Sequence, residues 1–186
     1  DIFADWDADE VFRAVLHGQL PVEKVVPEEL RQKEALFSRA SGVSQWDISL
    51  RVASAGPGEE RETWLEIYSG LEGIVMDFPA PLNKSAESSW PLTVHYPIRT
   101  DVNVLTGSMP GHVQLKMELD EEDASPIRAA VQLGGDVKGL PDEGFFVLNG
   151  SASLFDMDGW LDLIVDRLKQ TQDVGGLSLR AASVDA

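Results

Sequence analysis

The chain of 186 residues contains no cysteine, which excludes disulfide bonds, thiolate metal sites and a cysteine nucleophile. Its three histidines, His17, His95 and His112, are far apart and do not form the H-E-x-x-H pattern of zinc proteases. No apolar run approaches the roughly 18–20 residues that a membrane-spanning helix needs. We therefore expect no thiol chemistry, a structural role for each histidine, and no direct membrane insertion by this segment.

Basic residues are also scarce. The 15 lysines and arginines stand against 32 aspartates and glutamates, so the formal net charge is −17. An acidic surface of this kind repels phosphate backbones and anionic bilayers, so we expect no nucleic-acid binding and no docking on lipid headgroups. The simplest interpretation of the charge is a solubilising surface.

Patterns that would indicate catalysis or a metal site are missing. Residues 5–9 resemble the start of a calcium-binding loop, but Glu10 stands where the turn glycine belongs and Leu16 where the bidentate glutamate belongs. Residues 107–111 do not form a nucleophile elbow, because Ser108 directly follows the first glycine. We therefore expect no catalytic residue, no metal, no cofactor and no enzymatic activity.

The clearest positive signal is a strict alternation of apolar and polar residues. Four runs place their apolar side chains on one side of a strand, at residues 46–52, 92–98, 113–119 and 127–133. Such runs are typical of an antiparallel sheet with one apolar and one wet face, rather than of a parallel sheet covered by helices. We therefore predict a mainly β (α+β) fold, a curled and twisted antiparallel sheet with strands at 46–54, 63–78, 92–98, 102–119, 127–133 and 145–154.

About three short helices complete the predicted fold. Residues 7–16 carry a capping-box pattern and an apolar face that Gly18 would end, and residues 27–40 begin at a proline suited to a first helical turn. Asp158 is placed to cap a third helix at residues 159–170. We expect these helices to cover the ends of the sheet and one part of its apolar face.

A stretch rich in proline lies in the middle of the chain. Residues 70–84 read Gly-Leu-Glu-Gly-Ile-Val-Met-Asp-Phe-Pro-Ala-Pro-Leu-Asn-Lys, and Trp90-Pro91-Leu92 follows. This stretch resembles the recurring G-x-x-L-D-L-P-A-P-L-x-K … P-L segment of the YhdP-type proteins, which are long periplasmic members of the AsmA-like superfamily. Residues 139–150 followed by 154–161 provide a second match, and residues 41–47 a weaker third.

The resemblance implies a fold, a location and a function. YhdP-type proteins lie in the periplasm of Gram-negative bacteria, anchored in the inner membrane, and their β-sheet curls into a long groove lined with lipid. They are implicated in carrying phospholipid between the inner and outer membranes. The chain would then be a piece of a longer protein whose anchor lies outside it. Its partners would be phospholipid acyl chains and adjacent segments of the same long chain, with no chemistry and no cofactor.

On this basis the chain divides into three parts. Residues 1–42 form a helical N-terminal portion, residues 43–156 an antiparallel β-groove segment, and residues 157–186 a C-terminal helix and the start of a further strand. The expected groove lining comes from the apolar positions of the strands, namely Ile48, Leu50, Val52, Ile74, Met76, Phe78, Leu92, Val94, Tyr96, Val113, Leu115, Met117, Ile127, Val131 and Leu133.

Two other interpretations remain open from the sequence. The one-sided strands could close on themselves or on the helices as a filled core, which would make the chain a structural or interaction domain of a cell-envelope protein without lipid binding. The third class is a carbohydrate-binding or enzymatic β domain, since five tryptophans could stack on sugars. Most of the tryptophans, however, stand at strand or helix positions suited to packing.

Overall fold

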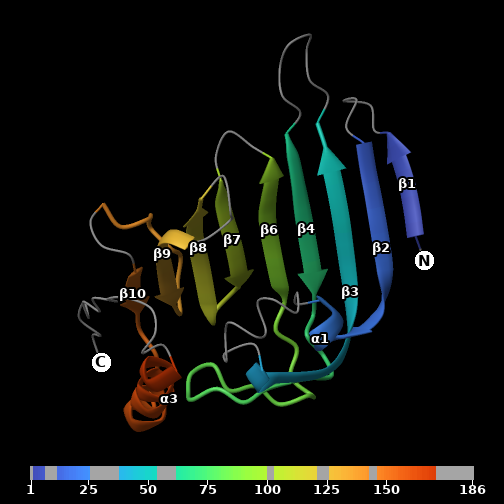
Figure 1. Ribbon diagram of the computed structural model, residues 1–186. Coiled ribbons are helices and arrows are strands. Elements are labelled where there is room, and N and C mark those ends of the chain that lie inside the picture. The colour runs from blue at the N-terminus through green and yellow to red at the C-terminus, as the bar shows by residue number, and fades with distance from the viewer. Residues whose placement is uncertain are drawn as a thin grey trace.

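The computed structural model describes residues 2–6, 12–25, 38–53, 62–99, 103–120, 126–142 and 146–170. These residues form a twisted open sheet of nine strands, a short tenth strand beside it and two helices (Figure 1). The strands are β1 (Ile2–Trp6), β2 (Phe12–Pro21), β3 (Ala40–Val52), β4 (Thr63–Ser69), β5 (Ile74–Met76), β6 (Leu92–Arg99), β7 (Val104–Met109), β8 (Val113–Leu119), β9 (Pro126–Leu133) and β10 (Phe146–Gly150). The helices are α1 (Val22–Val25) and α3 (Met157–Gln170).

The sheet is a meander that follows the order of the chain. Its strand order is β1-β2-β3-β4-β6-β7-β8-β9-β10, and each pair from β1 to β9 is antiparallel. The prediction of a mainly β fold is therefore confirmed. The prediction of a wholly antiparallel sheet is wrong at one edge, where β10 pairs with β9 in parallel. The separation between Leu133 and Phe146 permits this, because a parallel neighbour needs a crossover connection of about a dozen residues.

The prediction of a helical N-terminal portion is wrong for residues 2–6 and 12–21, which form β1 and β2. The apolar residues of this stretch fit a helical period. However, Phe12, Ala14 and Leu16 also stand at every second position, as the residues on one face of a strand do. Pairing with β3 decides in favour of the strand, because it satisfies the backbone groups of β2 and places that alternate set beside the apolar residues of β3. The predicted helix at 27–40 lies mostly outside the described residues, and from Ala40 onward the chain is strand β3.

Two predicted long strands are each divided. The stretch 63–78 becomes β4 and β5, separated by a turn in which Leu71 has a φ of 53°. The stretch 102–119 becomes β7 and β8, separated by a turn at Pro110. The third predicted helix is confirmed as α3, but its cap is Asp156, whose Oδ1 accepts the Gly159 N–H at 3.0 Å.

The strand register separates the sheet into two chemically different faces. One row of directly paired residues crosses all nine strands and is apolar throughout: Ile2, Leu16, Ile48, Ile67, Val94, Gly107, Leu115, Val131 and Leu148. The next row points to the opposite side. It is polar throughout: His17, Asp47, Tyr68, Thr93, Ser108, Gln114, Gln132 and Asn149. We call these sides the apolar face and the polar face.

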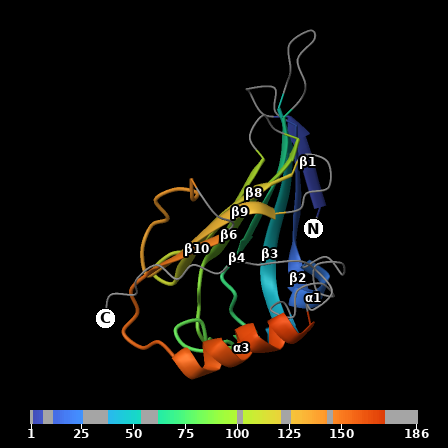
Figure 2. The same cartoon turned by 60° about the vertical axis from the view of Figure 1, so that its left-hand side comes forward.

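The lower end of the sheet, as drawn in Figure 1, is closed by a segment that we call the floor, residues 70–91 including β5. Strand β3 bends to reach it: residues 46–52 pair with β4, whereas residues 40–42 pair with β5. At the crossing, a Cβ on Gly42 would lie 2.1 Å from the carbonyl oxygen of Gly73, so both backbones need glycine. Figure 2 shows α3 running below the sheet at this end.

Candidate functional site

Most of the apolar face is only half-buried. In the row that contains Ile48, every residue from Leu16 on β2 to Leu148 on β10 is neither fully buried nor fully exposed. The adjacent row is half-buried at Leu50, Leu65 and Met117 as well, although Ala129, opposite Met117, is buried. A filled core would remove these side chains from water almost completely. We call these two rows the open strip.

Charged groups are confined to the other side of the strands. The lysine and arginine side chains described on the strands all register on the polar face: Arg13, Arg51, Lys116 and Arg128. Two of them pair with carboxylates there: Arg51 Nε lies 2.9 Å from Glu66 Oε2, and Arg128 contacts Glu118. Among the side chains that the structure describes, the apolar face from β2 to β10 carries no charged group, and its only polar side chains are Ser44, Thr63, Ser69 and Tyr96.

The lower end of the apolar face is closed as a small core. Trp46 is 3% exposed and packs with Val22 of α1 and with Leu71 and Ile74 of the floor. The indole N–H of Trp46 donates to the Leu20 carbonyl at 3.0 Å, so its single polar group is satisfied. Leu92 and Met109 pack against the same cluster from β6 and β7. The floor therefore covers the lowest row of the apolar face, while Ile48 and Ile67 of the open strip pack against this core and stay partly exposed.

A buried lysine holds the floor together. Lys84 is 4% exposed, and its Nζ donates to the carbonyls of Leu71, Ile74 and Ser85 at 2.7, 2.9 and 3.0 Å. Burial lowers the pKa of Lys84, and the nearby carboxylates of Glu72 and Glu87 oppose this. Sequence reasoning assigned no role to this residue. The available signal was a lone lysine among apolar residues and prolines in the stretch 70–84.

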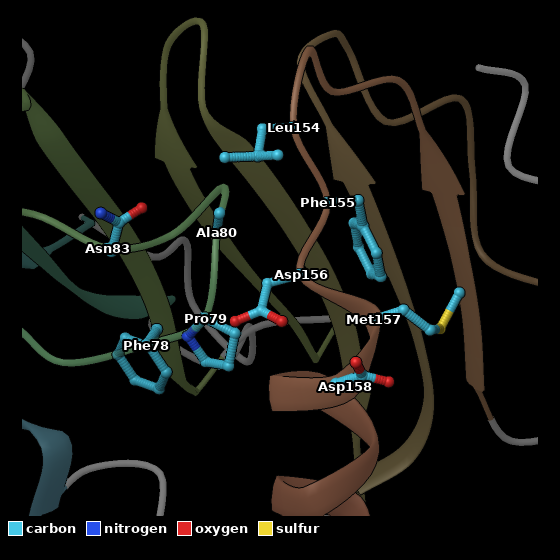
Figure 3. A pocket seen from close by; sticks show the side chains of 9 residues that line it. All are labelled: Phe78, Pro79, Ala80, Asn83, Leu154, Phe155, Asp156, Met157 and Asp158. Atoms are coloured by element: carbon cyan, nitrogen blue, oxygen red, sulfur yellow. The ribbon is translucent and has the colours of Figure 1, made fainter.

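Helix α3 is attached to the underside of the floor. Trp160 Nε1 donates to the Ala80 carbonyl at 2.9 Å, and the Asp156 N–H donates to the same oxygen at 3.2 Å. Between α3 and the floor lies a cleft of about 610 Å³ (Figure 3), lined by Phe78, Pro79, Ala80, Asn83, Leu154, Phe155, Asp156, Met157 and Asp158. Leu154, just before α3, and Met157, its first residue, are 68% and 53% exposed, so the cleft is open to solvent.

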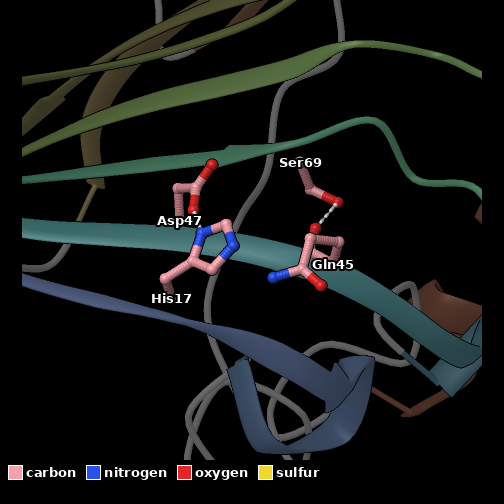
Figure 4. A network of polar contacts seen from close by, with 4 residues as sticks. All are labelled: His17, Gln45, Asp47 and Ser69. Carbon is pink, nitrogen blue, oxygen red and sulfur yellow. Dashed lines mark hydrogen bonds and ion pairs between the residues drawn. The ribbon is translucent and has the colours of Figure 1, made fainter. Parts of the chain in front are cut away.

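The histidines occupy structural positions. His17 lies on β2, not at a helix end as expected, and its Nδ1 contacts Asp47 on the polar face, while Ser69 donates to the Gln45 carbonyl nearby (Figure 4). His95 stacks on Trp64, and His112 stacks on Trp90 with ring centroids 3.7 Å apart. Within the described part of the chain, no group of three His, Asp or Glu side chains could hold a metal ion. Most of the calcium-loop-like run at 5–9 lies outside the described residues.

The structure does not bring all fifteen predicted lining residues together. Nine lie on the apolar face above or beside the floor: Ile48, Leu50, Val52, Val94, Tyr96, Val113, Leu115, Met117 and Val131. Leu92 packs on the core at the floor, Leu133 is buried at the lower end of β9, and Ile127 is 48% exposed at the upper end. Ile74 is buried inside the closed core, Met76 packs against it, and Phe78 lines the cleft beside α3.

Sequence reasoning missed several residues of the same face. They come from β2, which was predicted as a helix, and from β4, β7 and β10, where the alternation is short: Phe12, Ala14, Leu16, Leu65, Ile67, Leu105, Phe146 and Leu148. The alternation of apolar residues over residues 12–20 was the signal that would have identified Phe12, Ala14 and Leu16.

Comparison with known proteins gives one match. The family described as "YhdP protein" matches residues 6–185, which is nearly the whole chain. No curated protein and no solved structure matches the chain significantly. Among the described helices, none is long and apolar enough to cross a membrane.

Proposed function

Because the chain belongs to the YhdP family of bacterial envelope proteins related to lipid transport, we propose that its apolar face carries phospholipid acyl chains between the inner and outer membranes. In this proposal the chain is a periplasmic segment of a Gram-negative protein that is anchored in the inner membrane outside these residues. It works as a wall along which lipid moves, and it is not an enzyme.

The observation that supports this proposal most directly is the apolar row that crosses the whole sheet. Each of its residues is paired with the next, and those on β2 to β10 remain partly exposed. Contiguous exposed apolar surface is unfavourable in water by about 25 cal/mol per Å², so a large patch of this kind marks a surface that binds an apolar partner. An acyl chain is such a partner.

The dimensions suit an acyl chain that lies across the strands. Eight spacings of about 4.8 Å make the sheet about 38 Å wide. One acyl chain spans about half of a ~30 Å hydrocarbon core, or ~15 Å. The row through Ile48 is therefore long enough for a chain to lie along it and to move from strand to strand without leaving apolar surface.

The charge distribution suits the same proposal. None of the side chains described on the apolar face is charged and able to hold a headgroup, and Arg13, Arg51, Lys116 and Arg128 lie on the opposite face. A lipid on this face would contact it through its acyl chains, with its headgroup in water beyond the margin of the sheet. Binding of this kind involves many interchangeable aliphatic contacts instead of one specific site.

Adjacent segments of the same long chain are the proposed neighbours. The outer strands β1 and β10 each pair on one side only within the described residues, and the apolar row reaches both of them at Ile2 and Leu148. A strand edge with unpaired N–H and C=O groups favours addition of a further strand. Extension of the sheet at either edge would lengthen the apolar surface in the direction of the row.

Photo-crosslinking in cells tests the proposal. A crosslinking side chain at Val94, Leu115 or Val131 should capture phospholipid in the full-length protein, with Thr93, Lys116 and Gln132 as matched controls on the polar face. Capture at the first set and far less at the second supports the proposal. Equal capture at both sets, or none at any position, would contradict it and favour a domain that binds no lipid.

A further inference from the structure

We propose that Lys84 is a positioning residue: its ammonium group holds the floor against the lower end of the apolar face and so sets the margin of the strip that acyl chains occupy. This inference rests on the proposed function. It assigns a role to the one buried cation of the described residues, and it explains why the sheet is closed at one end and open above it.

All three N–H donors of the ammonium group are used within the floor. The floor runs out through residues 70–78 and back through residues 82–91, and we call these two stretches its arms. The ammonium group donates to the carbonyls of Leu71 and Ile74 on the first arm and to that of Ser85 on the second. The backbone bridge between Met76 and Lys84 brings the two arms together at the same point. One cation therefore joins both arms. Because Lys84 is only 4% exposed, bulk water has little access to these hydrogen bonds in the closed state.

Two of the three carbonyls that Lys84 binds, those of Leu71 and Ile74, belong to residues that close the face. The side chains of Leu71 and Ile74 are 5% and 1% exposed, and both pack with Trp46. Without the ammonium group, the three carbonyls would lose a charge-assisted partner inside the protein, and each buried polar group without a partner disfavours the closed state. The floor would then separate from Trp46 more readily.

The sheet itself does not depend on this contact. Its ladder from β2 to β9 is continuous, and the floor packs on the row of Trp46, Leu92 and Met109 at the lower end. Opening of the floor should therefore uncover that row while the open strip stays in place. Since successive rows lie two residues apart, the accessible strip would widen by about 6.6 Å.

The test uses the full-length protein with a leucine-sized diazirine side chain at Leu92, on the covered row, or at Leu115, on the open strip. In the protein with Lys84, capture of phospholipid at Leu92 should be well below capture at Leu115. In Lys84→Ala, capture at Leu92 should rise about fivefold, the factor that corresponds to about 1 kcal/mol, while capture at Leu115 stays within about twofold. Lys84→Arg, which keeps a cation with N–H donors, should give an intermediate result.

Chemical rescue separates the role of the ammonium group from the bulk of the side chain. Propylammonium fits the space left in Lys84→Ala and can donate to the three carbonyls, so it should return capture at Leu92 towards the original level. Tetramethylammonium has the same charge but no N–H group, so it should have no effect. Rescue by both ions, or by neither, would argue against the proposed role of the hydrogen bonds.

Amide hydrogen exchange provides a readout that does not require lipid. In Lys84→Ala the amides of Gly73 and Trp90, which bind Ala86 and Gly70 within the floor, should exchange at least about tenfold faster, while those of β8 are unchanged. Unchanged floor amides, or equal loss of protection in β8, would overturn the positioning role. If neither Leu92 nor Leu115 captures lipid in any variant, the proposed function fails, and exchange still decides whether Lys84 holds the floor.

Discussion

Trp46 and Ser69 face each other across β3 and β4 and are almost fully buried, at 3% and 1% exposure. Two residues further along the same strands, Ile48 and Ile67 also face each other, yet both remain half-exposed. The boundary between the closed core and the open strip thus runs between two neighbouring rows of one strand pair. The first row is almost fully buried and the second packs on the same core but stays partly exposed, so the two rows lead to different expectations for mutations.

Truncation of a side chain to alanine should therefore lower the free energy of unfolding much more at the closed row than on the open strip. Trp46→Ala is expected to lower the free energy of unfolding by about 3–5 kcal/mol, because it leaves a cavity under the floor. Leu115→Ala is expected to cost only about 1 kcal/mol, because water already reaches that side chain. Urea denaturation of the purified protein measures both. A loss at Leu115 as large as that at Trp46 would indicate a filled core.

A charge on the open strip should block transport without unfolding the sheet. Leu115→Asp places a carboxylate in the path of the acyl chains, so phospholipid transport should fall sharply while the melting temperature drops only slightly. In a filled core the same charge would cost several kcal/mol or would be neutralised. The control is Lys116→Asp on the polar face, which should leave transport unchanged. Collapse of the fold in Leu115→Asp would favour the closed-core interpretation.

The crossing of β3 and the floor should not tolerate a side chain. In Gly42→Ala the new Cβ would lie 2.1 Å from the Gly73 carbonyl oxygen, at a φ of 117°. We expect the free energy of unfolding to fall by at least about 2 kcal/mol. Gly18→Ala is the matched control: its Cβ meets no atom within 4 Å, so stability should be unchanged or slightly higher. Thermal melts of the two variants test this, and equal melting temperatures would contradict it.

His112 should make stability depend on pH in the acidic range. Burial lowers its pKa from the ordinary value of 6.5, so between the two pKa values the unfolded chain binds more protons than the folded one. The stability that the neutral imidazole contributes is complete above pH 6.5 and is lost as the pH falls through the folded-state pKa.

The variant His112→Phe isolates this contribution. It keeps an aromatic ring to stack on Trp90 but removes the titrating group. Melting temperatures at pH 7.5 and pH 5 should differ less in the variant than in the original protein. An identical difference in the two proteins would mean that protonation of His112 is not linked to folding.

Much of the fold could be predicted because its sequence pattern is local. The runs 46–52, 92–98, 113–119 and 127–133 alternate so regularly that only a strand places their apolar side chains together, and each lies in a strand of the sheet. Helix α3 could be predicted in the same way from its apolar side and its acidic start. For β2 the local pattern fitted both the helical period and the strand period of two, and pairing with the neighbouring strand β3 decided in favour of the strand.

The candidate site was only partly predictable, because exposure is not a local property. Alternation shows that Ile48, Leu115 and Ile74 are apolar and where each stands in its own strand, but the first two are half-exposed and the third is buried. That difference depends on the floor, which contains Ile74 and buries Trp46 but covers the next row only in part. Similarly, no local pattern could show that Lys84 donates to three carbonyls, since two of them belong to Leu71 and Ile74, at least ten residues before it in the chain.

The sequence by itself determined which residues are apolar on one side of each strand, where most strands and α3 lie, and to which family the chain belongs. These properties depend on side-chain period and on runs of neighbouring residues. Only the tertiary structure decided that all nine strands align their apolar residues in one continuous row, that β10 joins in parallel, and that the floor closes one end. Those properties depend on strand register and on contacts between residues distant in the chain, which local periodicity does not specify.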